Sequence, residues 1–285
     1  MSRIVYVDGE YVPEEEAKVS IFDRSFLMSD GVYEVTTILD GKLVEFDAHY
    51  RRLGRSCAEL KMPAPMPEAE LIEVHRQLIE RNGLTEGMIY LQCSRGSDGD
   101  RDFGWSEGIK PTWVLFSQAK AIIESPLAKR GAKVITAPDL RWGRRDIKTV
   151  QLLYPSLMKM EAKAAGADDA WLVEDGYVTE GTSNNAWIVK QDGTLVTRHL
   201  SNEILHGCTR AAVREQALGA QIAVEERAFT VEEAQGAAEA FITSASSFVT
   251  PVVEIDGVAI GTGAPGPMAA RLRELYIAAS RAAAK

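Results

Sequence analysis

Four short polar segments carry side chains that could do chemistry. The segment RWGRRDIK at 141–148 crowds three arginines beside Lys148, although such a cluster is also typical of a solvated basic loop. The run TEGTSNN at 179–185 is polar within an apolar stretch, and composition alone favours a hairpin loop there. The run TSASS at 243–247 could line a phosphate nest or form a plain turn. The segment GCTR at 207–210 opens a helix after a glycine, which is a ready anion site, although most helix starts bind nothing.

Short hairpins are expected to position these segments. Five of the seven Asp-Gly dipeptides stand between apolar or alternating runs, which is the strongest short-range hairpin signal. The sequence contains no GxGxxG, so antiparallel hairpins are favoured over a dinucleotide-binding βαβ fold. Apolar spacing and capping residues predict helices at 47–61, 67–82, 156–165, 209–219, 230–238 and 267–284. Strands and helices that do not strictly alternate predict an α+β fold.

The chain is long enough for two domains. Pro126 and Gly131 interrupt the sequence within 119–131, and we place the linker between the domains there. The expected division is therefore a small N-terminal domain at 1–118 and a large C-terminal domain at 132–285.

Composition excludes several function classes. The chain has 285 residues, with 32 basic against 41 acidic side chains and a net charge of −9, so nucleic acid and anionic membranes are not expected as main partners. Three widely separated cysteines without a CxxC, and four histidines without an HExxH, suggest neither a disulfide framework nor a metal site. The N-terminus does not resemble a signal peptide, and no apolar run approaches the length of a membrane span. These features predict a soluble, cytoplasmic protein.

Six segments are spread across nearly the whole chain: DGVYEV at 30–35, HYRRL at 49–53, RWGRRDIKTVQLL at 141–153, VTEGTSNNAWIV at 178–189, ILHGCTRAAV at 204–213 and FITSASSFVTPV at 241–252. Taken together and in this order, they resemble the class IV aminotransferases, the pyridoxal-phosphate family that contains D-amino acid and branched-chain aminotransferases. The resemblance implies the two-domain α+β fold of type IV pyridoxal-phosphate enzymes, with the cofactor in the cleft between the domains. It also implies a homodimer.

The resemblance assigns roles that the chemistry of pyridoxal phosphate explains. The cofactor needs a lysine that holds it as an imine and then moves the substrate's α-proton. It also needs an acidic group at the pyridine nitrogen, and cations and N–H groups at the phosphate. The matching positions are Lys148, Glu180 and Arg52, with Thr209 at a helix start as a further phosphate donor. Other cofactor contacts are expected at Ser183, Asn184, Cys208, Ser246 and Ala245, the last at the position of a family hydroxyl.

The substrate is inferred from three features. The segments at 23–43 and DIKTVQLL resemble D-amino acid aminotransferases more than branched-chain ones, and Tyr33 stands where a pocket tyrosine is expected. The segment RGSDGDRDFGW at 95–105 resembles the one in which an arginine reaches the substrate carboxylate. Arg101 is the expected clamp, because a guanidinium holds a carboxylate by two parallel hydrogen bonds. The loop is one residue longer than expected, so Arg95 is the alternative.

We therefore expect a transaminase that moves an amino group from a D-amino acid, such as D-alanine, to 2-oxoglutarate or pyruvate. A branched-chain enzyme would need an apolar pocket and L-substrates, and an (R)-amine transaminase would need no carboxylate clamp. A pyridoxal-phosphate lyase, such as an aminodeoxychorismate lyase, would need no amino acceptor. A catalytically silent binding protein is disfavoured because Lys148 and Glu180 are both present.

Overall fold

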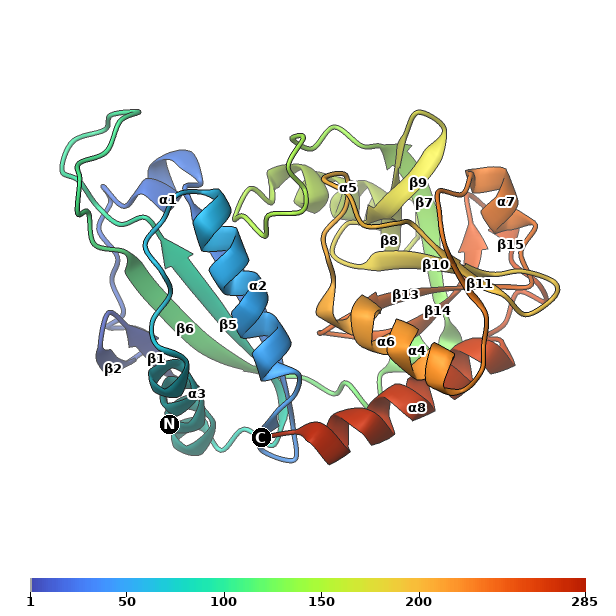
Figure 1. Ribbon diagram of the computed structural model, residues 1–285, viewed down its shortest axis with the longest axis horizontal. Helices are drawn as coiled ribbons and strands as arrows, with labels where there is room; N and C mark the ends of the chain where they lie inside the picture. The colour runs from blue at the N-terminus through green and yellow to red at the C-terminus, as the bar shows by residue number, and fades with distance from the viewer. Residues whose placement is uncertain (1) are drawn as a thin grey trace. The chain divides into compact units, whose positions relative to one another are not determined.

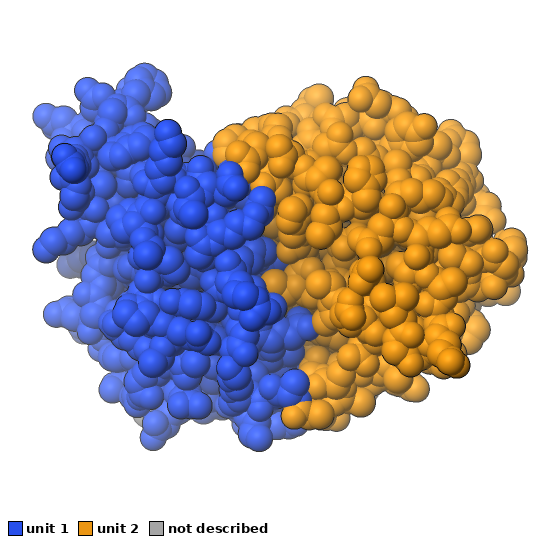
Figure 2. All heavy atoms as spheres, viewed as in Figure 1, with its two compact units in different colours: residues 1–121, 147–151, 283–285 blue, residues 122–146, 152–282 orange. Residues whose placement is uncertain are grey.

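The computed structural model describes residues 2–285 and divides into two compact units (Figure 2). The N-terminal unit comprises the chain up to Ala121 together with Ile147–Gln151 and Ala283–Lys285, and the C-terminal unit comprises Ile122–Asp146 and Leu152–Ala282. This division differs from the expected one in two respects. The break falls after Ala121, inside the expected linker, and the segment that carries Lys148 returns to the N-terminal unit.

A six-stranded antiparallel sheet forms the centre of the N-terminal unit, in the order β2-β1-β6-β5-β3-β4 (Figure 1). Its strands are β1 (Ile4–Val7), β2 (Glu10–Pro13), β3 (Gly31–Leu39), β4 (Lys42–Leu43), β5 (Glu86–Ser94) and β6 (Thr112–Ala119). The Asp-Gly pairs at 8–9 and 40–41 join β1 to β2 and β3 to β4, with positive φ at both residues. Such φ values are those of a two-residue type I′ turn, so these hairpin predictions are confirmed.

Two long helices cover one face of this sheet, α2 (Phe46–Glu59) and α3 (Glu68–Asn82), and α1 (Arg24–Met28) is a single short turn. Leu53 of α2 and Leu78 of α3 are fully buried in one apolar core with Ile89 of β5. Because successive side chains of a strand alternate between faces, Glu34 of β3 lies on the helix-covered face and Tyr33 on the other. The alternation in β3 thus places Glu34 and Tyr33 in two different environments.

The C-terminal unit is built on a nine-stranded mixed sheet, in the order β12-β11-β10-β13-β14-β7-β8-β9 with β15 paired to β14. The pairs β11/β12, β14/β7 and β7/β8 are parallel, and the others are antiparallel. The strands are β7 (Ala132–Pro138), β8 (Asp169–Glu174), β9 (Tyr177–Gly181), β10 (Asn185–Val189), β11 (Leu195–Thr197), β12 (Val224–Glu226), β13 (Glu239–Ser244), β14 (Phe248–Ile255) and β15 (Val258–Ala259). The expected α+β class is confirmed.

Five helices pack in this unit: α4 (Pro126–Arg130), α5 (Leu153–Ala164), α6 (Cys208–Gly219), α7 (Val231–Gln235) and α8 (Pro267–Ala283). The four helices predicted beyond residue 150 are therefore present, with ends shifted by up to three residues. Trp171, Ile188 and Phe229 belong to the unit's fully buried core. Within residues 2–285, no helix combines the length and the apolar character needed to cross a bilayer.

Candidate active site

Glu180, in β9, presents a buried carboxylate whose position is fixed by three donors. Arg141 donates from Nη1 to Oε1 at 2.6 Å, and Asn185 donates from Nδ2 to Oε2 at 3.0 Å. The backbone N–H of Leu205 reaches both oxygens, at 3.2 and 3.1 Å. A carboxylate offers about four acceptor positions, so this arrangement leaves capacity for one more donor, such as a protonated ring nitrogen.

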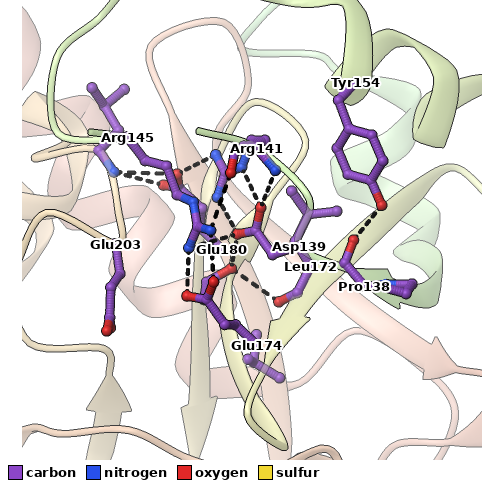
Figure 3. Close-up of polar contacts among 12 residues, drawn as sticks. Pro138, Asp139, Arg141, Arg145, Tyr154, Leu172, Glu174, Glu180 and Glu203 are labelled. Carbon is purple, nitrogen blue, oxygen red and sulfur yellow. Dashed lines mark hydrogen bonds and ion pairs between the residues drawn. The ribbon is translucent and has the colours of Figure 1, made fainter. Parts of the chain in front are cut away.

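The Arg141 guanidinium also affects the pKa of this carboxyl group. Burial raises the pKa of Glu180, and the positive charge of Arg141 opposes that shift. The guanidinium is itself oriented by Asp139, to which it donates from Nε at 2.9 Å and from Nη2 at 2.7 Å (Figure 3). Arg141 therefore bridges two buried carboxylates and orients the one that the sequence assigns to the cofactor.

The arginine-rich loop is part of this buried network. Arg145 binds Glu174, at the end of β8, through two hydrogen bonds of 2.7 and 2.8 Å, and its Nη1 lies 3.4 Å from Asp139 (Figure 3). Asp139 also accepts from Thr179 Oγ1 at 2.7 Å. The alternative of a solvated basic loop is therefore wrong for Arg141 and Arg145, whose side chains are largely buried.

A second part of the candidate site is the N-terminus of α6. Thr209 is buried in the first turn, beside the buried Cys208, and no side chain caps the helix, because its N-cap residue is Gly207. A Cβ at Gly207 would lie 2.1 Å from Asn185 Oδ1, so this approach requires glycine. An uncapped helix start with a hydroxyl in its first turn suits an anion.

A third part is the turn at 244–247 between β13 and β14. Ser244 Oγ lies 2.7 Å from Ser247 Oγ and 3.4 Å from Ser246 Oγ, so three hydroxyls gather there. Ala245 has no side-chain donor, and only its backbone N–H could contribute. The set of hydroxyls and N–H groups has the chemistry that a phosphate requires.

Asn185 connects these three parts. Its amide donates to Glu180, its Oδ1 approaches Gly207, and its backbone pairs in register with Thr243, directly before the serine turn. The structure therefore brings Glu180, the start of α6 and the 244–247 turn together. The neighbouring residues predicted from the same run differ: Ser183 is exposed, and Asn184 donates to Asp169 at 2.6 Å.

Lys148 lies beside Tyr33 in the N-terminal unit. The backbone N–H of Tyr33 donates to the Lys148 carbonyl at 2.9 Å, and Thr149 pairs with Val32, so the segment extends the sheet next to β3. The Lys148 Nζ lies 4.0 Å from the centroid of the Tyr33 ring, which stacks on Tyr90. Tyr33 thus packs against the amine that the family resemblance assigns to the imine and to proton transfer.

Arg52, in α2, is buried and bound to Glu34 of β3. It donates from Nε at 2.8 Å and from Nη2 at 2.7 Å, and His49 Nδ1 lies 2.7 Å from the same carboxylate. Although burial raises the pKa of Glu34, Arg52 and His49 hold it down at about 2. Arg51, the preceding residue in the helix, is exposed.

The two candidate substrate arginines differ in their surroundings. Arg95 is buried, donates to Asp30 at 2.7 Å and to the carbonyls of Leu60 and Lys61, and lies 3.9 Å from the centroid of the Trp105 ring. Arg101 is exposed, with its guanidinium 5.1 Å from the ring of Phe103. The guanidinium of Arg95 is already bonded to Asp30 and to two backbone carbonyls. Arg101 is therefore the better candidate for binding a substrate carboxylate.

Sequence reasoning did not single out Asp139, Asn185 or Glu34. Asn185 stood inside a flagged polar run, and Arg141 inside a flagged basic one, but their contacts depend on which strands are neighbours. Glu34 had one local signal, a carboxylate in the alternation that places Val32 and Ile38 on the inward face of the strand. Among residues 2–285, no group of three His, Cys, Asp or Glu side chains is arranged to hold a metal ion.

Comparisons with known proteins agree with the resemblance. The model of the amino-transferase class IV family matches residues 31–255. The D-alanine aminotransferase of Bacillus licheniformis is 38% identical over 266 residues, which are 93% of this chain and 92% of that protein.

Solved structures are similar over almost the full length. The branched-chain amino acid aminotransferase of Escherichia coli superposes with a TM-score of 0.90 at 24% identity, covering 98% of this chain and 95% of that one, and shows the fold. The branched-chain aminotransferase of Thermoproteus uzoniensis with norvaline gives 0.84 at 27% identity, covering 97% and 94%. A further branched-chain enzyme, solved with pyridoxamine 5'-phosphate, gives 0.86 at 30% identity, covering 98% and 94%. The chain belongs to the class IV aminotransferases.

Proposed function

We propose that the protein is a pyridoxal-phosphate-dependent transaminase that moves an amino group from a D-amino acid, such as D-alanine, to 2-oxoglutarate or pyruvate. The observation that carries this proposal is the buried Glu180 carboxylate, held by Arg141 and Asn185 beside the uncapped start of α6. The relatives named D-alanine aminotransferases support the D-amino acid substrate.

The donor set fits pyridoxal phosphate. Lys148 would hold the cofactor, Glu180 would accept from its pyridine nitrogen, and Ser183, Asn184 and Cys208 would adjoin it. Arg52, Thr209 and the 244–247 turn, including Ser246 and the N–H of Ala245, would bind the phosphate. When bound, the cofactor supplies an aldehyde that takes up the amino group and a ring that delocalises the electron pair left by the α-proton.

The chain's own residues do the rest of the chemistry. The Lys148 amine takes the substrate's α-proton and returns it at another carbon, so it acts as base and then as acid. The positive charge of Arg141 opposes protonation of Glu180, and a negative carboxylate there would favour a protonated ring nitrogen. The Tyr33 ring packs against the Lys148 side chain and restricts where its amine points.

Arg101 supports an amino acid over a simple amine as substrate. Its exposed guanidinium could hold the substrate carboxylate by two hydrogen bonds. We also propose that the domains correspond to 1–118 and 132–285, joined at 119–131. We further propose that the protein is a homodimer and acts in the cytoplasm.

One assay tests the substrate class. D-alanine, L-leucine and (R)-1-phenylethylamine are offered separately to the purified enzyme, with 2-oxoglutarate or pyruvate as acceptor, and the half-reactions are followed by the cofactor's absorbance. We expect D-alanine to react fastest. A faster reaction with L-leucine would indicate a branched-chain enzyme, and one with the amine would indicate an (R)-amine transaminase. Pyruvate release without an amino acceptor would indicate a lyase.

A further inference from the structure

Phe248 has an unusual backbone conformation at the end of the serine turn. Its φ is +59°, in the left-handed region that bulky side chains rarely adopt. Ser244 pairs with Phe248, so residues 245–247 form a three-residue hairpin loop and Phe248 follows them. Glycine is the usual residue at such a position. A neighbouring group is therefore needed to hold this conformation in place.

Arg273 of α8 supplies that restraint. Its Nη1 donates to the carbonyls of Ser247 and Val249, the residues before and after Phe248, at 2.8 and 2.7 Å. Its Nη2 donates to the carbonyls of Ile122 and Ile123 at the start of the C-terminal unit. One guanidinium thus binds the residues immediately before and after the left-handed residue and ties them to a second segment.

The same helix also reaches the start of α6 (Figure 1). Tyr276 lies one turn after Arg273, and its ring packs edge to face on the buried Phe248 ring at a centroid distance of 4.7 Å. The Tyr276 hydroxyl lies 3.4 Å from Thr209 Oγ1 in the first turn of α6. Helix α8 therefore contacts both elements that gather hydroxyls and N–H groups.

We propose that α8 positions the phosphate cradle, which we define as the 244–247 turn and the first turn of α6. Arg273 fixes the turn by holding Phe248 in its left-handed conformation, and Tyr276 links that residue to Thr209. Both act as positioning residues, because they act on the cradle through Phe248 and Thr209. This inference rests on the proposed binding of pyridoxal phosphate.

The test compares two ligands that differ only in the phosphate. Apoenzyme is titrated with pyridoxal phosphate and with pyridoxal, and the dissociation constant of each is measured by absorbance. Arg273→Met removes the clamp, and Arg271→Met, at an exposed arginine on the same helix, is the matched control. Thermal unfolding of each variant shows whether it is folded.

We expect Arg273→Met to weaken binding of pyridoxal phosphate by at least tenfold and binding of pyridoxal by less than twofold. Arg271→Met should change neither. Arg273→Lys keeps the charge but cannot bridge two carbonyls in the same way, so its effect should be intermediate. Tyr276→Phe keeps the ring and loses the hydroxyl, and should weaken the phosphate preference severalfold.

The outcomes separate this inference from the proposed function. If the wild-type apoenzyme binds pyridoxal phosphate no better than pyridoxal, the phosphate assignment itself is wrong. If the wild type prefers the phosphate and the folded Arg273→Met variant keeps that preference, the role of α8 is wrong. An equal loss for both ligands would also overturn it, as would an Arg273→Met variant that fails to fold while Arg273→Lys binds like the wild type.

Discussion

Arg141 donates to Glu180 across 2.6 Å while its other nitrogens hold both oxygens of Asp139. One cation therefore serves two buried carboxylates. Burial alone favours a neutral Glu180, and its pKa is raised despite the opposing charge of Arg141. Removal of Arg141 should therefore favour the protonated form of Glu180.

The first prediction concerns this pair. In Arg141→Met, the pKa of Glu180 should rise further, because an adjacent opposite charge shifts a carboxyl pKa by about 1–3 units. A carboxylate with a higher pKa protonates at higher pH, so the acid limb of the kcat/KM profile should move to higher pH. The profile is measured between pH 5 and 9. Arg144→Met, in the same loop, is the control, and an unmoved acid limb in Arg141→Met would contradict the role.

Glu180→Gln tests the carboxylate itself. The amide keeps the shape and should allow the cofactor to bind, but it cannot supply the negative charge that favours a protonated ring nitrogen. We expect kcat to fall by at least tenfold, since a hydrogen bond to a charged group contributes about 1.5–3 kcal/mol. Steady-state kinetics with saturating cofactor measure the loss. A rate equal to that of the wild type would exclude the assigned role.

Lys148→Ala should abolish transamination. The variant should also lose the covalent link to the cofactor that sodium borohydride traps, which mass spectrometry detects. Lys133→Ala removes an amine from β7 that is paired with Glu254, and should retain both properties. Normal turnover in Lys148→Ala would end the assignment.

Local chemistry made much of the fold predictable. The Asp-Gly pairs at 175–176 and 256–257 form hairpin turns with positive φ at both residues, because aspartate and glycine both tolerate that conformation. It was harder to predict which segments belong to which of the two units. Pro126 and Gly131 mark a local interruption, but the return of 147–151 to the N-terminal unit depends on pairing with β3, which no local pattern encodes.

For the candidate site, too, some features could be predicted from local sequence and others could not. Motif resemblance assigned cofactor roles to Lys148 and Glu180 from their sequence neighbours, and these roles stay predictions. Arg141 and Glu180 are 39 positions apart, and their contact exists because β7 and β9 both flank β8. To predict which residue pairs with a buried charge, one must therefore know the order of the strands in the sheet, and local sequence patterns do not specify that order.

Arg52→Ala should weaken cofactor binding far more than Arg51→Ala. Arg52 is buried and oriented by Glu34, whereas Arg51 is exposed. Removing Arg52 also takes the guanidinium away from the buried Glu34 carboxylate, which keeps its contact with His49, and breaking a buried pair costs about 3–5 kcal/mol of stability. Cofactor affinity is therefore measured together with urea unfolding.

Glu34→Gln separates these two effects, because it breaks the pair and retains the arginine. If Glu34→Gln matches Arg52→Ala in stability but binds pyridoxal phosphate more tightly, Arg52 contacts the cofactor directly. Equal cofactor affinity in Arg52→Ala and Arg51→Ala would show that the wrong arginine was assigned.

Arg101 is the least constrained of the assigned residues, and its test depends on the substrate. Its side chain is exposed, and it contacts the Phe103 ring within its own loop. A guanidinium that binds the substrate carboxylate should lower KM for D-alanine and have no effect on a substrate without a carboxylate. Arg101→Ala should therefore raise KM for D-alanine by about 10–100-fold, the equivalent of about 1.5–3 kcal/mol, and leave cofactor affinity and any turnover of (R)-1-phenylethylamine unchanged.

Lys110→Ala, which removes an exposed cation from the same loop, should leave KM for D-alanine within twofold. Arg95→Ala should instead lower thermal stability, because it leaves the carbonyls of Leu60 and Lys61 without their donor. A normal KM for D-alanine in Arg101→Ala would remove the proposed clamp.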